Sequence, residues 1–306
     1  MFPFVLRRLV HSVIVVFFIV TFCFFMMRVA PGGPFDQERV LPPEIMQNIE
    51  AKYHLDEPLF KQYGRYLTDV FFHFDLGPSY KYPSRSVNEF IAEGFPVTLQ
   101  LGFLSLLVAI ILGVGMGLVA ALKQNTRWDY AAMAIAMIGV SIPSFVLAPL
   151  LQLLFGLKFG LFPVAGWDGF SSMILPSIAL GTAYAASMAR LTRGGMLEIV
   201  RQDFVRTARA KGLPERLIVL RHMIRGGLLP VVTYLGPAAA FMMSGSLVIE
   251  KIFDIPGLGR HLINSALNRD YTMTLGMVIF ISLLVLVFNL LVDVAYGLLD
   301  PRVKNE

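Results

Sequence analysis

The stretch RQDFVRTARAKGLPERLIVLRHMIRGGLLP runs from Arg201 to Pro230 between two long apolar segments, and its pattern predicts a helix, a stop and a second helix. Apolar residues of the first helix recur at helical spacing while the arginines lie largely off that face, so the helix is amphipathic. Its expected apolar face consists of Leu197, Val200, Phe204 and Ala208.

The stop between the two helices is a glycine followed closely by a proline. Gly212 can adopt the left-handed conformation that closes a helix, and Pro214 suits the first turn of the next one. The expected apolar side of the second helix is formed by Leu217, Leu220 and Ile224. Two short helices are therefore predicted to meet at a tight corner.

The same region is strongly basic. From Arg190 to Arg225 there are nine Arg or Lys residues and three acidic residues. So much charge is too costly to place in hydrocarbon, and basic loops are typical of the cytosolic side of a membrane protein. We therefore expect this loop to lie in water, in the cytosol.

The composition is that of a polytopic membrane protein. Hydrophobic residues make up 56% of the chain and charged residues 15%, with a mean hydropathy of +0.67. The formal charge of +5 is concentrated at the ends of apolar runs, so it does not indicate nucleic-acid binding. Cys23 is the single cysteine, which excludes an intrachain disulfide, and its position in an apolar run favours a packing role.

The hydropathy pattern predicts an all-α fold with six transmembrane helices. Each apolar run approaches or exceeds the about 20 residues that a helix needs to cross a bilayer. The expected spans are residues 9–29, 97–122, 130–155, 173–191, 228–249 and 271–299. This divides the chain into an N-terminal anchor (1–30), an extracytoplasmic helical region (31–95) and a five-span core (96–306) that includes the basic loop 192–227.

The distribution of basic residues predicts that both termini are cytoplasmic. Segments expected inside hold 15 Lys or Arg, and those expected outside hold 10. Six of these 10 lie in the 31–95 region, which is so long that its basic residues have little effect on membrane orientation. The first apolar run is also longer than the about 7 to 15 residues of a signal-peptide core, which favours an uncleaved anchor.

Proline and glycine residues predict kinks in one span and close helix packing at another. Pro143 and Pro149 predict kinks in the third span. Gly113 and Gly117 are four residues apart in the second span, a spacing that lets another helix approach closely in a membrane. In the 31–95 region, residues 43–53 and 58–72 are expected to be helical, and another amphipathic helix is expected after Gly259.

In the basic loop, Arg206-Thr207-Ala208 is followed by three residues and Gly212. This pattern resembles the EAA loop of binding-protein-dependent ABC importer permeases, in which the glycine is the most diagnostic position. Arg206 replaces the usual glutamate and Thr207 the first alanine, and RTARAKGL is the form seen in the dipeptide and oligopeptide branch.

Other stretches agree with that branch over nearly the whole chain: residues 28–34, FDLGPS (74–79), and DIPGLG (254–259) with Asn268, Arg269 and Asp270. LPPEIMQNIEAKYHLDEP (41–58) resembles the B-type membrane subunit of oligopeptide permeases in particular.

The resemblance implies a MetI-like permease core that forms half of a peptide pathway in a bacterial inner membrane. Implied partners are a second, homologous permease subunit, two ATP-binding subunits or domains, an extracytoplasmic peptide-binding protein and the lipid bilayer, but no nucleic acid. No cofactor is implied on this chain, because ATP and Mg would bind the ATPase subunits. The implied ATPase-coupling residues are Arg206, Thr207, Ala208, Arg209, Lys211, Gly212, Leu213 and Pro214.

Two further sets of residues are candidates for transport. Contact with the receptor or the outer gate is implied for Glu250, Asp254, Pro256, Gly257, Arg260, Arg269 and Asp270. Asn289 and Asp293 are polar residues four apart in the last span, so we expect them to face protein or water, with pairing to a neighbouring helix preferred over a role in the pathway.

Competing functions have less support in the residues. An ion-coupled carrier, the main alternative, would need ionisable residues in several spans, and Asp293 is the principal one. An enzyme would need clustered catalytic groups, whereas the five histidines are scattered and H-E-x-x-H is absent. No catalytic, cofactor or metal site is predicted, and the absence of a P-loop places ATP hydrolysis on partner subunits.

Overall fold

The computed structural model describes residues 2–29, 54–82 and 84–299, and this part of the chain is helical, without a strand. The central pair is α4 (Val87–Leu122) and α7 (Phe170–Val200), which run side by side, with α11 (Leu229–Met243) alongside. Ser86 caps α4 by accepting a hydrogen bond from the Glu89 backbone N–H at 3.3 Å. The expected helix at 43–53 lies outside the described residues.

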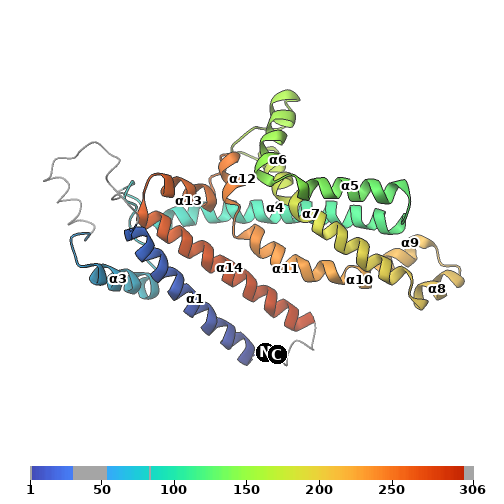
Figure 1. The fold of residues 1–306 in the computed structure, drawn as a ribbon, viewed down its shortest axis with the longest axis horizontal. Coiled ribbons are helices and arrows are strands. Elements are labelled where there is room, and N and C mark those ends of the chain that lie inside the picture. The colour runs from blue at the N-terminus through green and yellow to red at the C-terminus, as the bar shows by residue number, and fades with distance from the viewer. Residues whose placement is uncertain (1, 30–53, 83, 300–306) are drawn as a thin grey trace.

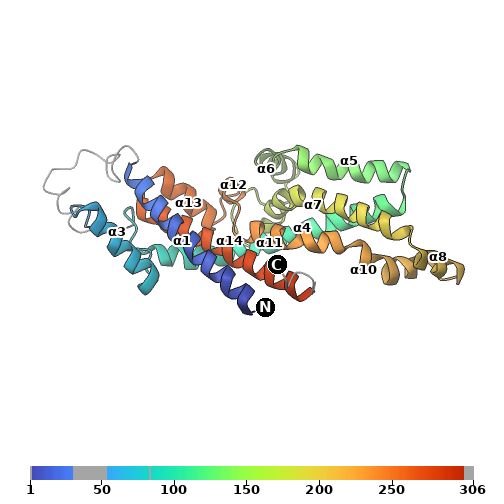
Figure 2. The same cartoon turned by 60° about the horizontal axis from the view of Figure 1, so that its bottom comes forward.

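A second pair of long helices crosses this group obliquely. α1 (Phe2–Val29) and α14 (Tyr271–Leu299) lie side by side in both views (Figures 1 and 2). One end of this pair lies near α3 (Leu59–Thr68), its wide-turn continuation η1 (Asp69–His73) and α13 (Leu258–Leu267). The helices expected within 58–72 and after Gly259 are thus confirmed.

Four helical segments are long and apolar enough to cross a membrane: Arg7–Val29, Val87–Leu122, Phe170–Val200 and Tyr271–Val292. The number rises to six if each of two sharply bent helix pairs is one span. One pair joins the segment Glu215–Gly227 to α11 at 55°. An all-α, polytopic membrane fold is therefore confirmed, with four to six candidate spans among the described residues.

The other bent pair replaces the single kinked helix expected at 130–155. α5 (Arg127–Ser141) ends before Pro143, and α6 (Ser144–Leu151) with η2 (Gln152–Lys158) leaves it at 104°. Pro143 holds an extended conformation and immediately precedes α6. The proline therefore starts a new helix rather than bending an existing one.

Small residues bring α4 and α7 together, as expected for Gly113 and Gly117. A methyl group on Gly113 would meet the Ala185 carbonyl oxygen at 2.7 Å, and one on Gly117 would overlap Thr192 and the Ala189 carbonyl. Gly115, which lies between them, has nothing within 4 Å of the same position. The two backbones thus approach along one face of α4.

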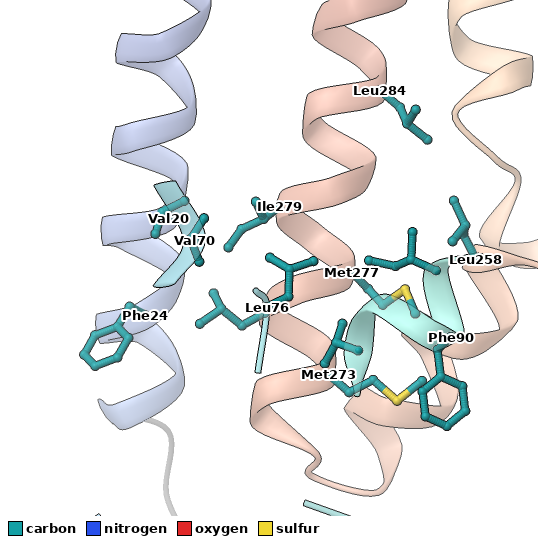
Figure 3. Close-up of a cluster of buried hydrophobic side chains, with 13 residues drawn as sticks. Val20, Phe24, Val70, Leu76, Phe90, Leu258, Met273, Met277, Ile279 and Leu284 are labelled. Carbon is teal, nitrogen blue, oxygen red and sulfur yellow. The ribbon is translucent and has the colours of Figure 1, made fainter. Parts of the chain in front are cut away.

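One apolar cluster joins the oblique pair to η1, α13 and α4 (Figure 3). Val20 and Phe24 of α1 pack with Val70 of η1, and the cluster continues through Met277 of α14 to Phe90 of α4. Cys23 is half-buried and packs against this cluster, in agreement with a packing role.

The two ends of the α4–α7 pair differ in what they carry. At one end are α8 (Asp203–Ala210), α9 (Glu215–Leu217), η3 (Ile218–Met223) and α10 (Ile224–Gly227), which we call the coupling end (Figure 1). At the other end are α3, α12 (Leu247–Ile252) and α13, which we call the far end.

Candidate functional site

The corner at the coupling end has the predicted helix, stop, helix form. Gly212 has a left-handed φ of +75°. Its N–H donates to the Arg209 carbonyl at 2.9 Å, and the Leu213 N–H donates to the Ala208 carbonyl at 3.3 Å. These two bonds form a Schellman motif, in which Leu213 also packs with Ala208 in one apolar cluster. The corner is therefore defined by backbone geometry that glycine favours.

Pro214 starts the second helix. Its carbonyl accepts hydrogen bonds from the N–H groups of Leu217 at 2.9 Å and Ile218 at 3.2 Å, and α9 begins at the next residue. η3 follows with a wider turn than an α-helix, and α10 and α11 continue the chain into the bundle. The glycine and proline seen in the sequence therefore have their predicted roles.

Most predicted coupling residues are exposed. The exceptions are Ala208, which is buried, and Leu213, which is half-buried. Three large apolar side chains are also exposed on this region: Phe204 (47%), Leu217 (38%) and Leu220 (57%). An exposed surface that mixes cations with large apolar groups is typical of a protein-docking site.

Those exposed apolar residues correct the predicted face of the first helix. α7 ends at Val200, the chain turns at Arg201 and Gln202, and α8 begins at Asp203. The helical register restarts there, so Val205 is buried together with Ala208, while Phe204 is exposed. The prediction for Phe204 is wrong because it assumed one uninterrupted helix.

The expected apolar side of the second helix is also wrong. Ile218, Val219 and Met223 are buried, whereas Leu217 and Leu220 are exposed and Ile224 is only half-buried. The wide turn of η3 changes the angular position of each side chain, which a regular period of 3.6 residues does not reproduce. Regular spacing alone could not have found this face.

Ion pairs connect the charged residues of the corner. Arg209 donates to both carboxylate oxygens of Glu215, at 2.6 and 3.2 Å, across the turn at Gly212. Arg206, the position of the family's glutamate, pairs with Asp203 at 3.5 Å, and both side chains are well exposed. The first pair links α8 to α9, while Arg206 remains accessible to a partner.

The corner packs firmly on the helical bundle. Its buried side chains form one cluster with Met196 of α7 and Ala121 of α4. α10 lies so close to α7 that a methyl group on Gly195 would overlap the Gly227 carbonyl. A displacement of the corner would therefore act directly on α7 and α4.

A further ion pair joins α7 to α5 at the coupling end. Arg193 of α7 donates to both oxygens of Asp129 at the start of α5, each at 2.8 Å, and the Asn125 N–H donates to the same carboxylate at 3.0 Å. The Asp129 side chain is 2% exposed. Sequence reasoning missed this pair because its partners are 64 residues apart.

The far end contains the predicted receptor-side or gate residues. Asp254 and Arg260 form an ion pair at 3.0 Å, and Asp254 and Arg269 both have left-handed backbones. Pro256 is exposed, whereas Gly257 is buried. This group of residues thus lies on the linker between α12 and α13, in the first turn of α13 and just after its end.

Two acidic residues of this set are buried. Glu250 is completely buried against α4 and α13. Asp270 is 1% exposed and accepts hydrogen bonds from the Ser79 hydroxyl and the N–H groups of Tyr80 and Met273. Neither carboxyl group is therefore accessible on the surface of this chain.

The structure describes the side chain of only one of the two polar residues predicted to matter in the last span. Asn289 is exposed on the surface of this chain. The side chain of Asp293 lies outside the described residues. In the part of the chain that the structure describes, no three His, Cys, Asp or Glu residues are placed to hold a metal ion.

Known families match both parts of the chain. The profile of the binding-protein-dependent transport system inner membrane component matches residues 109–305, and that of the corresponding N-terminal membrane component matches residues 1–102. The chain belongs to this family. It is thus a multi-pass inner membrane component of a transport system.

Curated relatives match the chain over nearly its full length. The oligopeptide transport system permease protein OppB of Escherichia coli (strain K12) is 51% identical and that of Haemophilus influenzae 48%, each over 99% of this chain and all of the relative. The dipeptide transport system permease protein DppB of Bacillus subtilis (strain 168) is 46% identical, over 94% of this chain and 92% of that protein.

Solved structures support the fold. A chain of the MetNI methionine ABC transporter in an inward-facing conformation has a TM-score of 0.56 at 18% identity, covering 71% of this chain and 97% of that one. A chain of an amino acid ABC transporter has a TM-score of 0.53 at 19% identity, covering 70% and 94%. The MetI-like permease fold expected from the sequence is thus confirmed.

Proposed function

We propose that this chain is a permease subunit of an ATP-driven importer of oligopeptides and forms half of its translocation pathway. The corner at Gly212 carries this proposal, because it presents cations and large apolar groups on a segment packed against α4 and α7. Full-length similarity to oligopeptide permease proteins supports the substrate class. The division into anchor (1–30), outward-facing region (31–95) and permease core (96–306) is part of the same proposal.

The partners follow from the two ends of the bundle. The coupling end docks a cytosolic ATPase through Arg206, Thr207, Ala208, Arg209, Lys211, Gly212, Leu213 and Pro214, and the exposed Phe204, Leu217 and Leu220 extend that surface. A second, homologous permease completes the pathway, with two ATPase subunits or domains and an extracytoplasmic peptide-binding protein. Asn289, exposed on α14, faces the second permease or the pathway.

Transport by the reconstituted importer tests this function directly. Proteoliposomes holding the complete complex are expected to accumulate labelled oligopeptides only with Mg-ATP on the coupling side and the peptide-binding protein on the other. Ionophores that dissipate proton and sodium gradients should leave the initial rate unchanged. Accumulation driven by an ion gradient without ATP would instead establish the ion-coupled carrier.

Cysteine labelling tests the orientation. In a Cys23→Ala background, Lys211→Cys and Ala266→Cys each place one thiol at an exposed position, at the coupling end and the far end respectively. A membrane-impermeant maleimide is expected to label Lys211→Cys only from the cytosolic side and Ala266→Cys only from the outside. Labelling of Lys211→Cys from outside in intact cells would contradict the cytoplasmic location of the corner.

A further inference from the structure

The Glu250 carboxyl group is the most fully buried acidic group at the far end. One oxygen, Oε1, accepts a hydrogen bond from the Thr98 hydroxyl of α4 at 3.0 Å. The other, Oε2, accepts from the backbone N–H groups of Gly259 at 2.7 Å and Arg260 at 3.4 Å in α13. A single side chain of α12 therefore joins three helices.

The surrounding backbone fits closely around this carboxyl group. A methyl group on Gly257 would overlap Oε2, and one on Gly259 would approach it to 3.0 Å. Thr98 also accepts a hydrogen bond from the Leu258 N–H at 2.9 Å, so the first turn of α13 is held on α4 from two directions. Between α11 and α12 lies Gly245, with φ +104°, a backbone conformation that suits a pivot.

Charged groups on the elements around Glu250 interact with residues other than Glu250. Arg260 pairs with Asp254, Lys251 donates to Asn264 at 2.7 Å, and Glu93 of α4 pairs with Arg85 at 2.6 Å. His261 packs edge-on against the Phe90 ring. Among the described residues, Glu250 is thus held by neutral donors and not by a cation.

Burial without a cation favours the protonated form of a carboxyl group. Desolvation raises the pKa of Glu250 from 4.5 to about 7, against the opposing effect of the hydrogen bonds from Gly259 and Thr98. The geometry accommodates the proton, because Oε1 can donate it to the Thr98 hydroxyl while Oε2 still accepts from the backbone. Either protonation state can therefore occupy the site.

We propose that Glu250 is a positioning residue for transport: its carboxyl group clamps the α12–α13 segment to α4, and protonation of that group strengthens the clamp. This inference rests on the proposed transport function, in which the far end opens and closes. When the segment separates from α4, the carboxyl group becomes hydrated.

The pKa of Glu250 differs between the closed and open arrangements, and this difference determines how pH shifts the balance between them. A group with a raised pKa in the closed arrangement stabilises that arrangement when protonated, so the stabilisation declines as pH rises from 4.5 toward about 7. The ratio of closed to open forms can change on the order of a hundredfold across this range. Opening is therefore easier above neutral pH.

Spin labels on the intact importer can measure the clamp. In a Cys23→Ala background, labels at Ala92→Cys on α4 and Ala266→Cys on α13 occupy exposed positions on the two clamped elements. In nanodiscs with the ATPases bound, from about pH 5.5 to about pH 8.5, the distance distribution is expected to be narrow at low pH and to gain a longer component as the pH rises toward about 7. The rate of receptor-stimulated ATP hydrolysis should change over the same interval.

Substitutions at Glu250 and Thr98 distinguish the effect of the clamp from a general loss of stability. Glu250→Gln imitates the protonated carboxyl group. The distance distribution and the rate of ATP hydrolysis should therefore no longer change with pH, and the narrow distance distribution should be retained. Thr98→Val should add the longer component even at low pH, whereas Thr98→Ser should behave as the parent protein because it keeps the hydroxyl group.

His261 is the titratable neighbour that needs a control, because burial and Arg260 lower its pKa. His261→Asn should preserve both pH profiles. A pH profile that survives Glu250→Gln, or one that His261→Asn removes, would overturn the proposal. The distance measurement does not require peptide uptake, so the proposed function can fail while the clamp is confirmed.

Discussion

Replacing Gly212 with valine is expected to lower peptide uptake and co-purification of the ATPase subunits by about fivefold or more. The left-handed φ of +75° at this position costs a branched side chain on the order of 1–2 kcal/mol, so the corner would change shape. Because about 1.4 kcal/mol corresponds to a factor of ten in an equilibrium, docking should fall about fivefold to thirtyfold. Uptake by reconstituted vesicles and ATPase retention on an affinity column are the two measurements.

Two control variants separate the effect of conformation from that of added volume. Gly194→Val adds the same side chain to an exposed helical position of α7, where nothing lies within 4 Å, and should leave uptake nearly unchanged. Gly212→Asn tolerates the left-handed backbone and should recover a substantial share of uptake. Normal uptake and ATPase retention in Gly212→Val would refute docking at this corner.

Replacing Gly117 with leucine is expected to prevent normal folding of the bundle. A methyl group here already overlaps Thr192 and the Ala189 carbonyl, so the larger side chain would force α4 away from α7. Overpacking of a buried site costs typically about 1–3 kcal/mol, and contact with backbone leaves little room for relaxation. The measurement is the monodisperse yield after detergent extraction, together with the melting temperature of the extracted protein.

Gly115→Leu is the matched control, since it lies on the same helix two residues away and has no atom within 4 Å of the added group. It should give a yield and melting temperature close to those of the parent protein. If Gly117→Leu matched it in both measurements, the close packing of α4 on α7 would not be essential to the fold.

The coupling corner could be predicted from sequence because its determinants are local. A glycine followed two residues later by proline specifies a helix end and a helix start whatever surrounds them. The buried side of each helix was less predictable, since Phe204 and Leu220 are exposed where an uninterrupted period of 3.6 would bury them. Breaks at 201–202 and the wide turn of η3 restart the register, and the hydropathy pattern carries little sign of either.

The partners of distant contacts could not be predicted. Glu250 looks like a loop carboxylate in the sequence, but its burial depends on Thr98, 152 residues earlier. The 104° turn after α5 was likewise expected only as a kink, because a proline in an apolar run does not specify the angle. Local chemistry therefore located the corner at Gly212, while the environment of the far-end carboxyl groups required the three-dimensional arrangement.

The hydrogen bonds between Ser79, Tyr80 and Asp270 connect positions about 190 residues apart in the chain. During synthesis, the ribosome must therefore produce the first residues of α14 before the segment that precedes α4 can find its partner. Until then the N-terminal third lacks this anchor. We expect its resistance to an added protease to rise only when the final helix has been inserted, which makes the completion of the far end a late event in biogenesis.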